Sequence, residues 1–258
     1  MTISHAPSHA STADPFTGDS ALSAIALHGD AHAAVLDRHR LDFCCGGRRT
    51  LATACAAAGV DVEQVLRELN TEAGAAASAS TAAPSDWHEQ PIADLIDHIV
   101  DGHHAFTRAA LARLGPLLRK VVDRHGDRHP ELRRVAPAFF ELAAELEPHM
   151  AREEIVLFPY IRALTAGDEH PQRPPFGTVR NPVRMMMMQH DRAAALLAEI
   201  QDASNDLATP ADACTSYAVL YAGLRELRLD LLRHVSLENN VLFPRAIALE
   251  EASRFPEG

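Results

Sequence analysis

Apolar residues recur at alternating steps of four and three along the C-terminal part of the chain, as on the buried face of a bundle helix. The clearest stripe consists of Leu220, Leu224, Leu227, Leu231, His234, Glu238 and Val241. A second consists of Leu142, Leu146, His149, Glu153, Val156 and Tyr160, and a third of Val183, Met186, His190, Ala193, Leu197 and Ile200. Histidine or glutamate therefore occupies predicted core positions on three separate helices.

These stripes predict four long helices, which span Pro91–Gly115, Glu131–Thr165, Thr178–Ser204 and Pro210–Ala252. No segment alternates with period two, so we expect no sheet. Four helices joined by modest loops predict an all-α fold, with an antiparallel four-helix bundle over residues 87–252.

The N-terminal part predicts a small helical domain over residues 21–70, preceded by a disordered tail (1–20) and followed by a flexible linker (71–86). Its predicted helices cover Ala21–His39, Thr50–Ala58 and the residues from Asp61 to about Asn70, with Gly59 closing the second helix. The segment DFCCGG lies in a loop between the first two helices. Small residues dominate 71–86, which is typical of a linker.

Composition agrees with helices and disfavours two classes of partner. Aromatic residues make up only 5% of the chain, and 35 acidic against 24 basic side chains leave a formal net charge of -11. That balance gives little support to nucleic-acid binding. The chain has no apolar run of about 18 residues and no secretory signal pattern, so we expect no membrane association. Four irregularly spaced cysteines favour a reducing cytoplasm.

The motif His-x3-Glu-x2-Val-Leu-Phe-Pro occurs twice, beginning at His149 and at His234. A spacing of four residues on an α-helix turns by only about 40°, so the His and the Glu of each copy project from one face. An ion pair within each helix, or hydrogen-bonded core histidines, would be the alternatives to a metal site. A metal explains both pairs and His190 together, because buried carboxylates are paired or bind metals.

Imidazole and carboxylate ligands without thiolate suit iron, manganese or zinc, and two similar half-sites favour a binuclear centre. Further ligands are expected from the first long helix, where His98, His103 and His104 compete. Adjacent helical residues point about 100° apart, so periodicity does not choose between His103 and His104. The direction of His125, beyond a Gly115-Pro116 break, cannot be read from helical phase. Three others are interpreted as solvated loop residues: His88, His129 and His170.

The C-terminal part, about residues 90–250, resembles hemerythrin-like di-iron domains, and the chain from about residue 18 resembles the Repair of Iron Centres family of the ScdA/YtfE type. The matching segments are LDFCCGG at Leu41–Gly47, IDHIV at Ile96–Val100, HMAREEIVLFP from His149 and HVSLENNVLFP from His234. The resemblance implies two non-haem iron ions in an oxo- and carboxylate-bridged centre. Its implied ligands are His104, His125, His149, Glu153, His190, His234 and Glu238, with Glu153 and Glu238 bridging. The run Met185–Met188 is interpreted as core packing beside this centre.

Cys44 and Cys45 are candidate redox-active or metal-binding residues. Their Cα atoms lie about 3.8 Å apart in a trans peptide, so a disulfide between them would be strained. Arg48, Arg49 and the helix start near Thr50 predict a stabilised thiolate. We expect the pair to deliver or sense redox equivalents, or to pass iron, when the small domain docks on the bundle. Cys55 and Cys214 are expected to be buried and inert.

The resemblance implies a stress-response protein that repairs iron–sulfur clusters damaged by nitric oxide (NO) or peroxide. Iron donation and reduction of NO to N2O are the two mechanisms it suggests. Its partners would be iron–sulfur proteins, with NO or O2 as small ligands, and the chain could form a homodimer. An O2- or NO-binding sensor without repair activity is the main alternative, and a structural bundle without metal is a further one.

Overall fold

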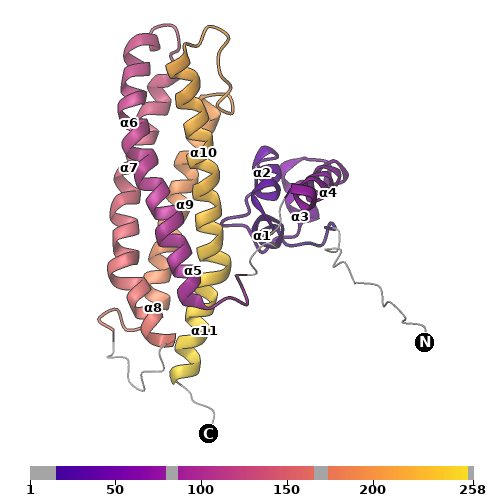
Figure 1. Ribbon diagram of the computed structural model, residues 1–258, viewed down its shortest axis with the longest axis vertical. Helices are drawn as coiled ribbons and strands as arrows, with labels where there is room; N and C mark the ends of the chain where they lie inside the picture. Colours follow the sequence, from indigo (N-terminus) through magenta and orange to yellow (C-terminus); the bar gives the residue numbers. More distant parts are fainter. Residues whose placement is uncertain (1–15, 80–86, 166–173, 255–258) are drawn as a thin grey trace, which may run out of the picture.

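The computed structural model describes residues 16–79, 87–165 and 174–254. Those residues form helices, turns and one isolated bridge between Ala21 and Thr50, and no strand was found among them. The predicted all-α class is therefore confirmed. Figure 1 shows a tall helical bundle with a smaller helical unit at its side.

Each column of the bundle is nearly continuous, and three of them contain one short π-helical segment (η). The first column is α5 (Ile92–His98), η1 (Ile99–His104) and α6 (Ala105–His125); the second is α7 (Leu132–Arg152), η2 (Glu153–Leu157) and α8 (Phe158–Thr165). The third is α9 (Arg180–Ala203), and the fourth is α10 (Thr215–Leu237), η3 (Glu238–Leu242) and α11 (Phe243–Arg254). The predicted bundle helices are thus present, although the fourth begins at Thr215 rather than at Pro210.

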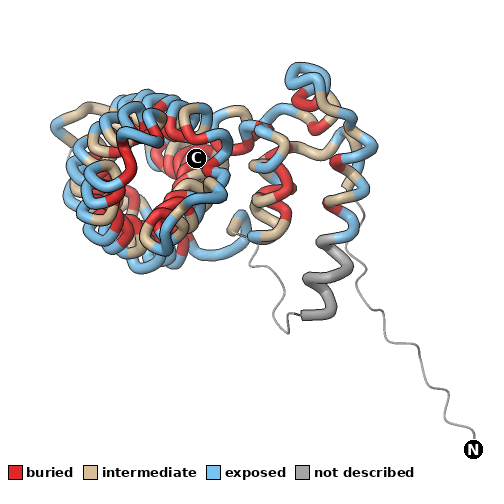
Figure 2. The backbone as a smooth tube through the Cα atoms, turned by 90° about the horizontal axis from the view of Figure 1, so that it is seen from above, coloured by how far each residue is buried: buried red, intermediate tan, exposed pale blue. Residues whose placement is uncertain are grey.

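Two separate apolar clusters fill the bundle, one above the other. The larger one takes its side chains from residues 110–121, 132–150, 193–207 and 217–231 of the four columns. The smaller one takes them from residues 92–99, 157–161, 179–186 and 237–246. In every column the two clusters leave a gap, which holds His104, Glu153, His190 or His234, and two further candidate ligands, His149 and Glu238, lie at the edges of the gaps. The level that holds these residues, called the metal layer below, therefore lies between two apolar clusters. Figure 2 shows buried residues on the inner faces of the columns.

The N-terminal unit contains α1 (Leu22–Leu27), α2 (Asp30–Arg38), α3 (Leu51–Ala58) and α4 (Val62–Ala79) around its own apolar cluster. The Thr50 side chain caps α3 by accepting a hydrogen bond from the backbone N–H of Thr53 at 3.2 Å. Gly59 ends α3 with φ at 69°, a left-handed conformation that favours glycine. Leu229 and Leu232 of α10 also pack on this cluster, which joins the unit to the bundle.

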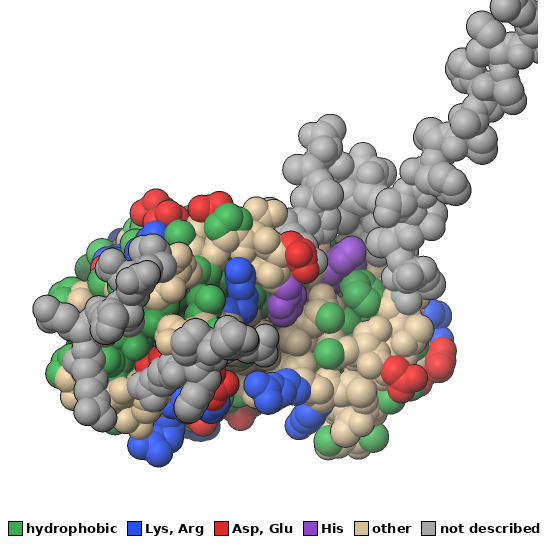
Figure 3. All heavy atoms as spheres, turned by 90° about the horizontal axis from the view of Figure 1, so that it is seen from below, with side chains coloured by type: hydrophobic (Ala, Val, Ile, Leu, Met, Phe, Trp, Pro, Cys, Tyr) green, Lys and Arg blue, Asp and Glu red, His purple; other side chains and the backbone are tan. Residues whose placement is uncertain are grey.

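Ion pairs add to that junction. Arg233 on α10 lies 2.5 Å from Asp30, and Arg228 on the same helix pairs with Asp37. Arg40 reaches the far end of α9 and its loop, at 2.6 Å from Asp202 and 2.7 Å from Asp206. Acidic and basic side chains are interspersed on the face shown in Figure 3, and histidines gather there where the two parts meet.

The structure corrects several predicted boundaries. The helix expected over Ala21–His39 is two helices separated at Gly29. The helix expected to end near Asn70 continues to Ala79, because residues 71–79 are rich in alanine, so this part of the predicted linker is wrong. Part of the predicted tail is also ordered, since Phe16 packs edge-on against His28. The other tail residues, 1–15, lie outside the described residues.

The expected break at Gly115-Pro116 is absent, because α6 runs through Pro116 to His125. Proline removes one backbone hydrogen bond from a helix. Here the apolar face formed by Leu114, Leu118 and Val121 stays buried in the larger cluster, and this packing outweighs the loss. No helix in the described part of the chain is long and apolar enough to cross a membrane.

Candidate metal centre

Each π-helical segment begins or ends at a candidate ligand. His104 is the last residue of η1, Glu153 is the first of η2, and Glu238 is the first of η3. Such wider turns occur often at functional sites because they shift the phase of the residues that follow. The shift corrects one predicted core position: Val156 is 43% exposed, whereas the next residue, Leu157, is buried. The metal layer is thus built by local departures from the α-helix.

Four histidine Nε2 atoms and two carboxylates converge in this layer. His104 Nε2 lies 3.2 Å from His234 Nε2, and His149 Nε2 lies 3.1 Å from His190 Nε2. Glu153 lies within 3.4 Å of His104 and 3.2 Å of His149. Glu238 lies 3.1 Å from both His190 and His234. All six residues are at most 3% exposed.

The donors form two groups that share both carboxylates. One group is His104, Glu153, His234 and Glu238, and the other is His149, Glu153, His190 and Glu238. Within each group the donor atoms lie within 4.8 Å of one another. Two ligands about 2.1 Å from a common ion lie roughly 3.0–3.4 Å apart at ordinary coordination angles, and the distances above match this.

Hydrogen bonds orient three of the four rings. His149 Nδ1 lies 2.9 Å from the amide oxygen of Gln189, and His190 Nδ1 lies 2.9 Å from that of Asn239. Because an amide oxygen only accepts, each Nδ1 carries a proton, which leaves Nε2 as the atom that can present a lone pair to a metal ion in the layer. Glu154 accepts from His104 Nδ1 at 2.6 Å and also binds Arg108.

This orientation makes the layer a cation site. Facing Nε2 lone pairs about 3 Å apart repel each other unless a proton or metal ion lies between them. The buried oxygens of Glu153 and Glu238 have no hydrogen-bond partner in the described structure. The donor set therefore fits metal ions that accept nitrogen and oxygen ligands.

Protonation follows from the same geometry. Burial alone would raise the pKa of Glu238, but His234 and His190 outweigh it and hold that pKa well below its usual range. Burial alone would lower the pKa of His149, but Glu153 and Glu238 raise it to about 9. Metal binding therefore displaces a proton from this layer at neutral pH.

The structure brings together six of the seven predicted ligands and decides between the neighbouring histidines. His104 points into the layer, whereas His103 Nδ1 pairs with Asp230 at 2.9 Å. Both rings are buried, because η1 breaks the regular helical phase on which the sequence argument relied. His98 stacks on Trp87 and stays outside the donor groups.

His125 is a correction to the predicted ligand set. Its Nε2 lies 3.1 Å from Cys214 Sγ, and its ring packs edge-on against Tyr217. The 21 residues of α6 rise by about 1.5 Å each, which separates His125 from His104 by roughly 30 Å. Two related expectations also change: Cys214 is exposed, and His129 is buried between Glu131 and Asp212.

Replacing His125 by alanine is expected to leave metal binding unchanged, because its ring lies at the far end of α6 from the donor groups. Metal content per chain, measured by plasma mass spectrometry, checks this. His104→Ala is the matched comparison on the same column, and it is expected to lower the metal content. Equal metal loss in both variants would contradict the position of His125 outside the metal centre.

Three residues of the site were missed by the sequence reasoning: Gln189, Asn239 and Glu154. Each directly neighbours a ligand in the chain, at His190, Glu238 and Glu153 respectively. Adjacent helical positions point about 100° apart, so these side chains were not expected to reach the ligands of other helices. A polar residue beside each of these ligands was the available signal.

In the run Met185–Met188, which precedes His190, only Met186 is buried and the other three methionines are exposed. The interpretation of this run as core packing therefore holds for Met186 alone.

The cysteine pair lies where the N-terminal unit meets the bundle. Cys44 is buried and Cys45 is exposed, with their Sγ atoms 3.7 Å apart. The hydrogen bond to Cys45 and burial both raise the pKa of the Cys44 thiol, and the Asp42 carboxylate adds to the shift. This direction contradicts the thiolate predicted for Cys44, because burial, Cys45 and Asp42 all favour the neutral thiol, while Arg48 and Arg49 are exposed. Asp42, Cys44 and Cys45 form a third group of possible metal donors.

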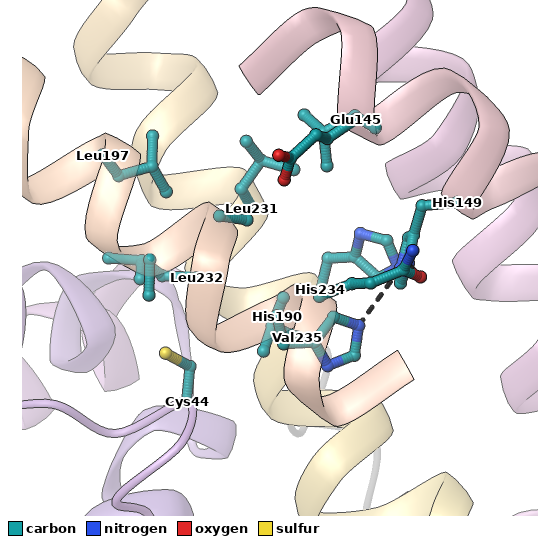
Figure 4. Close-up of a pocket in the computed structure, with 13 residues that line it drawn as sticks. Cys44, Glu145, His149, His190, Leu197, Leu231, Leu232, His234 and Val235 are labelled. Carbon is teal, nitrogen blue, oxygen red and sulfur yellow. Dashed lines mark hydrogen bonds between the residues drawn. The ribbon is translucent and has the colours of Figure 1, made fainter. Parts of the chain in front are cut away.

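A small cavity lies between Cys44 and the metal layer. Its volume is about 20 Å³, enough for about one water-sized molecule. Cys44, His149, His190 and His234 line it, together with apolar side chains of α7, α9 and α10. In Figure 4 the Cys44 sulfur points toward this space from one side, and the His149–His190 contact lies at the other.

Comparison with known proteins agrees with this arrangement. The hemerythrin HHE cation binding domain family matches residues 95–246, and the ScdA_N domain of unknown function (DUF542) matches residues 18–73. The iron–sulfur cluster repair protein YtfE of Escherichia coli O157:H7 is 36% identical over 232 residues, which cover 90% of this chain and 98% of that protein. The chain belongs to the YtfE family of iron–sulfur cluster repair proteins.

Other members of this family are similarly related. The YtfE protein of Citrobacter koseri is 35% identical over 232 residues, and that of Cronobacter sakazakii is 36% identical over 233 residues. Each match covers 90% of this chain and 98% of the relative. Both the N-terminal unit and the bundle therefore belong to the shared architecture.

Proposed function

We propose that this protein repairs iron–sulfur clusters damaged by nitrosative or oxidative stress, and that it does so in the cytoplasm with two non-haem iron ions in the metal layer. The observation that carries the proposal is the pair of donor groups that share Glu153 and Glu238. The family relation supports the repair function, since the relatives are named iron–sulfur cluster repair proteins. A sensor without repair activity gains no comparable support.

The ligand roles follow from the two groups. His104 and His234 would hold one ion, His149 and His190 the other, and the two carboxylates would bridge them. The ions supply electrons and open coordination positions when they are bound. Gln189, Asn239 and Glu154 would hold the rings of His149, His190 and His104 so that Nε2 faces the ions. The two apolar clusters exclude water from above and below.

Two mechanisms agree with this site, namely transfer of iron to a damaged cluster and reduction of NO to N2O. The apolar walls of the cavity favour a small uncharged ligand such as NO over a charged one. Cys44 lines this cavity together with His149, His190 and His234. We therefore retain Cys44 and Cys45 as candidates for passing iron or redox equivalents.

Metal analysis of anaerobically purified protein tests the first part of the proposal. We expect about two irons per chain, as in other bundle cores with paired carboxylate–histidine motifs. Incubation with an enzyme whose [4Fe–4S] cluster has been damaged by NO tests the second part. We expect the activity of that enzyme to return, with metal-stripped protein as the control.

Two measurements separate the mechanisms. Loss of iron from the protein during recovery of the damaged enzyme would support donation. Formation of N2O in the headspace after anaerobic addition of NO would support reduction. Zinc in place of iron, or intact iron without any recovery of the damaged enzyme, would contradict the proposal.

A further inference from the structure

Asn239 connects the cysteine loop to a candidate metal ligand. It lies in η3 directly after Glu238, and only 8% of it is exposed. Its amide oxygen lies 2.9 Å from His190 Nδ1, and its amide nitrogen donates to the backbone carbonyl of Cys44 at 3.2 Å. The same nitrogen lies 4.0 Å from Cys45 Sγ. The Asn239 side chain therefore links the Cys44–Cys45 loop to the candidate metal centre.

Only one orientation of this amide serves both contacts. If the amide were reversed, its oxygen would face the Cys44 carbonyl oxygen, and its N–H groups would face His190 Nδ1. His190 would then have to carry its proton on Nε2, where it could not bind a metal. The orientation that presents the Nε2 lone pair to the layer is thus the one that the Cys44 carbonyl selects.

The cysteine loop is packed closely enough to transmit a displacement. Asn240 donates to the carbonyl oxygens of Phe43 and Cys44 at 3.4 Å each, and Ser236 donates to that of Phe43 at 3.4 Å. A Cβ atom on Gly47 would lie 2.6 Å from the Phe43 carbonyl oxygen and 2.7 Å from Asn240 Oδ1. The loop therefore cannot move without altering the contacts of η3.

Gln189 supplies a natural comparison. It holds His149 as Asn239 holds His190, with a 2.9 Å hydrogen bond to Nδ1. Within the described structure, its side chain makes no hydrogen bond to the cysteine loop. His149 and His190 are thus held by equivalent amides, but of the two amides only that of Asn239 is hydrogen-bonded to the loop.

We propose that Asn239 is a positioning residue that couples the conformation of the Cys44–Cys45 loop to the metal affinity of the His149/His190 donor group. This inference rests on the proposed metal centre and deepens it by naming how the N-terminal unit regulates it. Displacement of the loop withdraws the Cys44 carbonyl, releases the Asn239 amide and weakens the hold on His190. The His104/His234 donor group keeps its own support through Glu154 and Arg108 and is not affected.

The test is a double-mutant cycle on the full chain, with Co2+ as the probe. Titration of metal-free protein, followed by visible absorption, is expected to give two dissociation constants. Asn239→Leu should weaken one of them by about 10–100-fold, as loss of a ligand-orienting partner does. Asn239→Asp, which can still accept from His190 Nδ1, should restore most of that affinity, whereas a merely structural role would not be rescued by a buried charge.

Coupling is measured by displacing the loop. Gly47→Ala, and the milder Asn240→Ala if the former does not fold, should weaken the same dissociation constant by about tenfold, within the range for ligand-orienting partners. Neither should have any further effect when combined with Asn239→Leu or Asn239→Asp. In the Gln189→Leu background, the loop variants should retain their full effect. Additive effects in the Asn239 backgrounds would overturn the proposal.

A second readout separates this inference from the proposed function. Nitrogen-15 NMR of the metal-free chain should show a protected proton on His190 Nδ1 that exchanges faster in Asn240→Ala. If wild-type protein binds no Co2+ but this change in exchange is seen, the metal centre fails, whereas the hydrogen-bond link from the loop to His190 stands. If Co2+ binds and the exchange is unchanged, the coupling fails and the metal centre stands.

Discussion

Replacing Glu238 by alanine is expected to remove both metal ions, lowering the iron content from about two per chain to near zero. Glu238 belongs to both donor groups, so its loss leaves each ion with three of its four protein ligands and removes one of the two negative charges. Loss of an orienting partner alone costs about 10–100-fold in metal affinity, and loss of a shared ligand should cost each site more than that. Iron content after anaerobic gel filtration measures the effect.

Two variants frame this result. Glu145→Ala removes a carboxylate that lines the cavity but belongs to neither donor group, so the metal content should not change. His234→Ala removes a ligand of one group only and should leave about one ion per chain. If Glu238→Ala keeps one ion while His234→Ala loses both, the assignment of Glu238 as the shared ligand is wrong.

Removal of both ions by an anaerobic chelator is expected to lower the thermal midpoint of the bundle by at least about 10 °C, the shift that the loss of one ion would give. An ion present at about 1,000 times its Kd stabilises the folded state by about 4 kcal/mol. For a domain of 150–250 residues, each kcal/mol corresponds to a shift of about 2–4 °C. Without the ions, the buried carboxylates and the facing Nε2 atoms lose their common partner.

Circular dichroism at 222 nm with and without the chelator follows this change. Glu238→Ala serves as the control, since its thermal midpoint should not respond to the chelator. Re-addition of Fe2+ should restore the midpoint of the wild-type chain. An unchanged midpoint in chelated wild-type protein would show that the metal layer is stable as an ion-pair network on its own.

Sequence periodicity was sufficient to predict most of the bundle helices and their buried faces, because it depends only on residues that are close in the chain. The apolar stripes around Leu142, Leu197 and Leu227 each extend over several turns and all lie in the larger apolar cluster. The duplicated His-x3-Glu spacing likewise predicts two ligands on one helical face. These inferences need only the geometry of an isolated helix.

Predictions failed where tertiary packing outweighs local preference. Gly115-Pro116 predicts a break, but burial of the flanking leucines keeps α6 continuous, and this continuity removes His125 from the site. Val156 was placed on the core stripe, but the wider turn of η2 carries it to the surface. Neither effect can be read from a helical wheel.

The sequence by itself determined the helical class, the paired motifs and the type of metal chemistry, because residue identity and spacing along one helix decide these. Only the tertiary structure decided which histidines meet, since that depends on how four columns align along their length. It also revealed that Asn239 contacts both His190 and the Cys44 carbonyl. His190 is 49 positions away from Asn239 in the chain, and Cys44 is 195 positions away. Contacts at such separations are set by the packing of whole helices, and no local pattern records them.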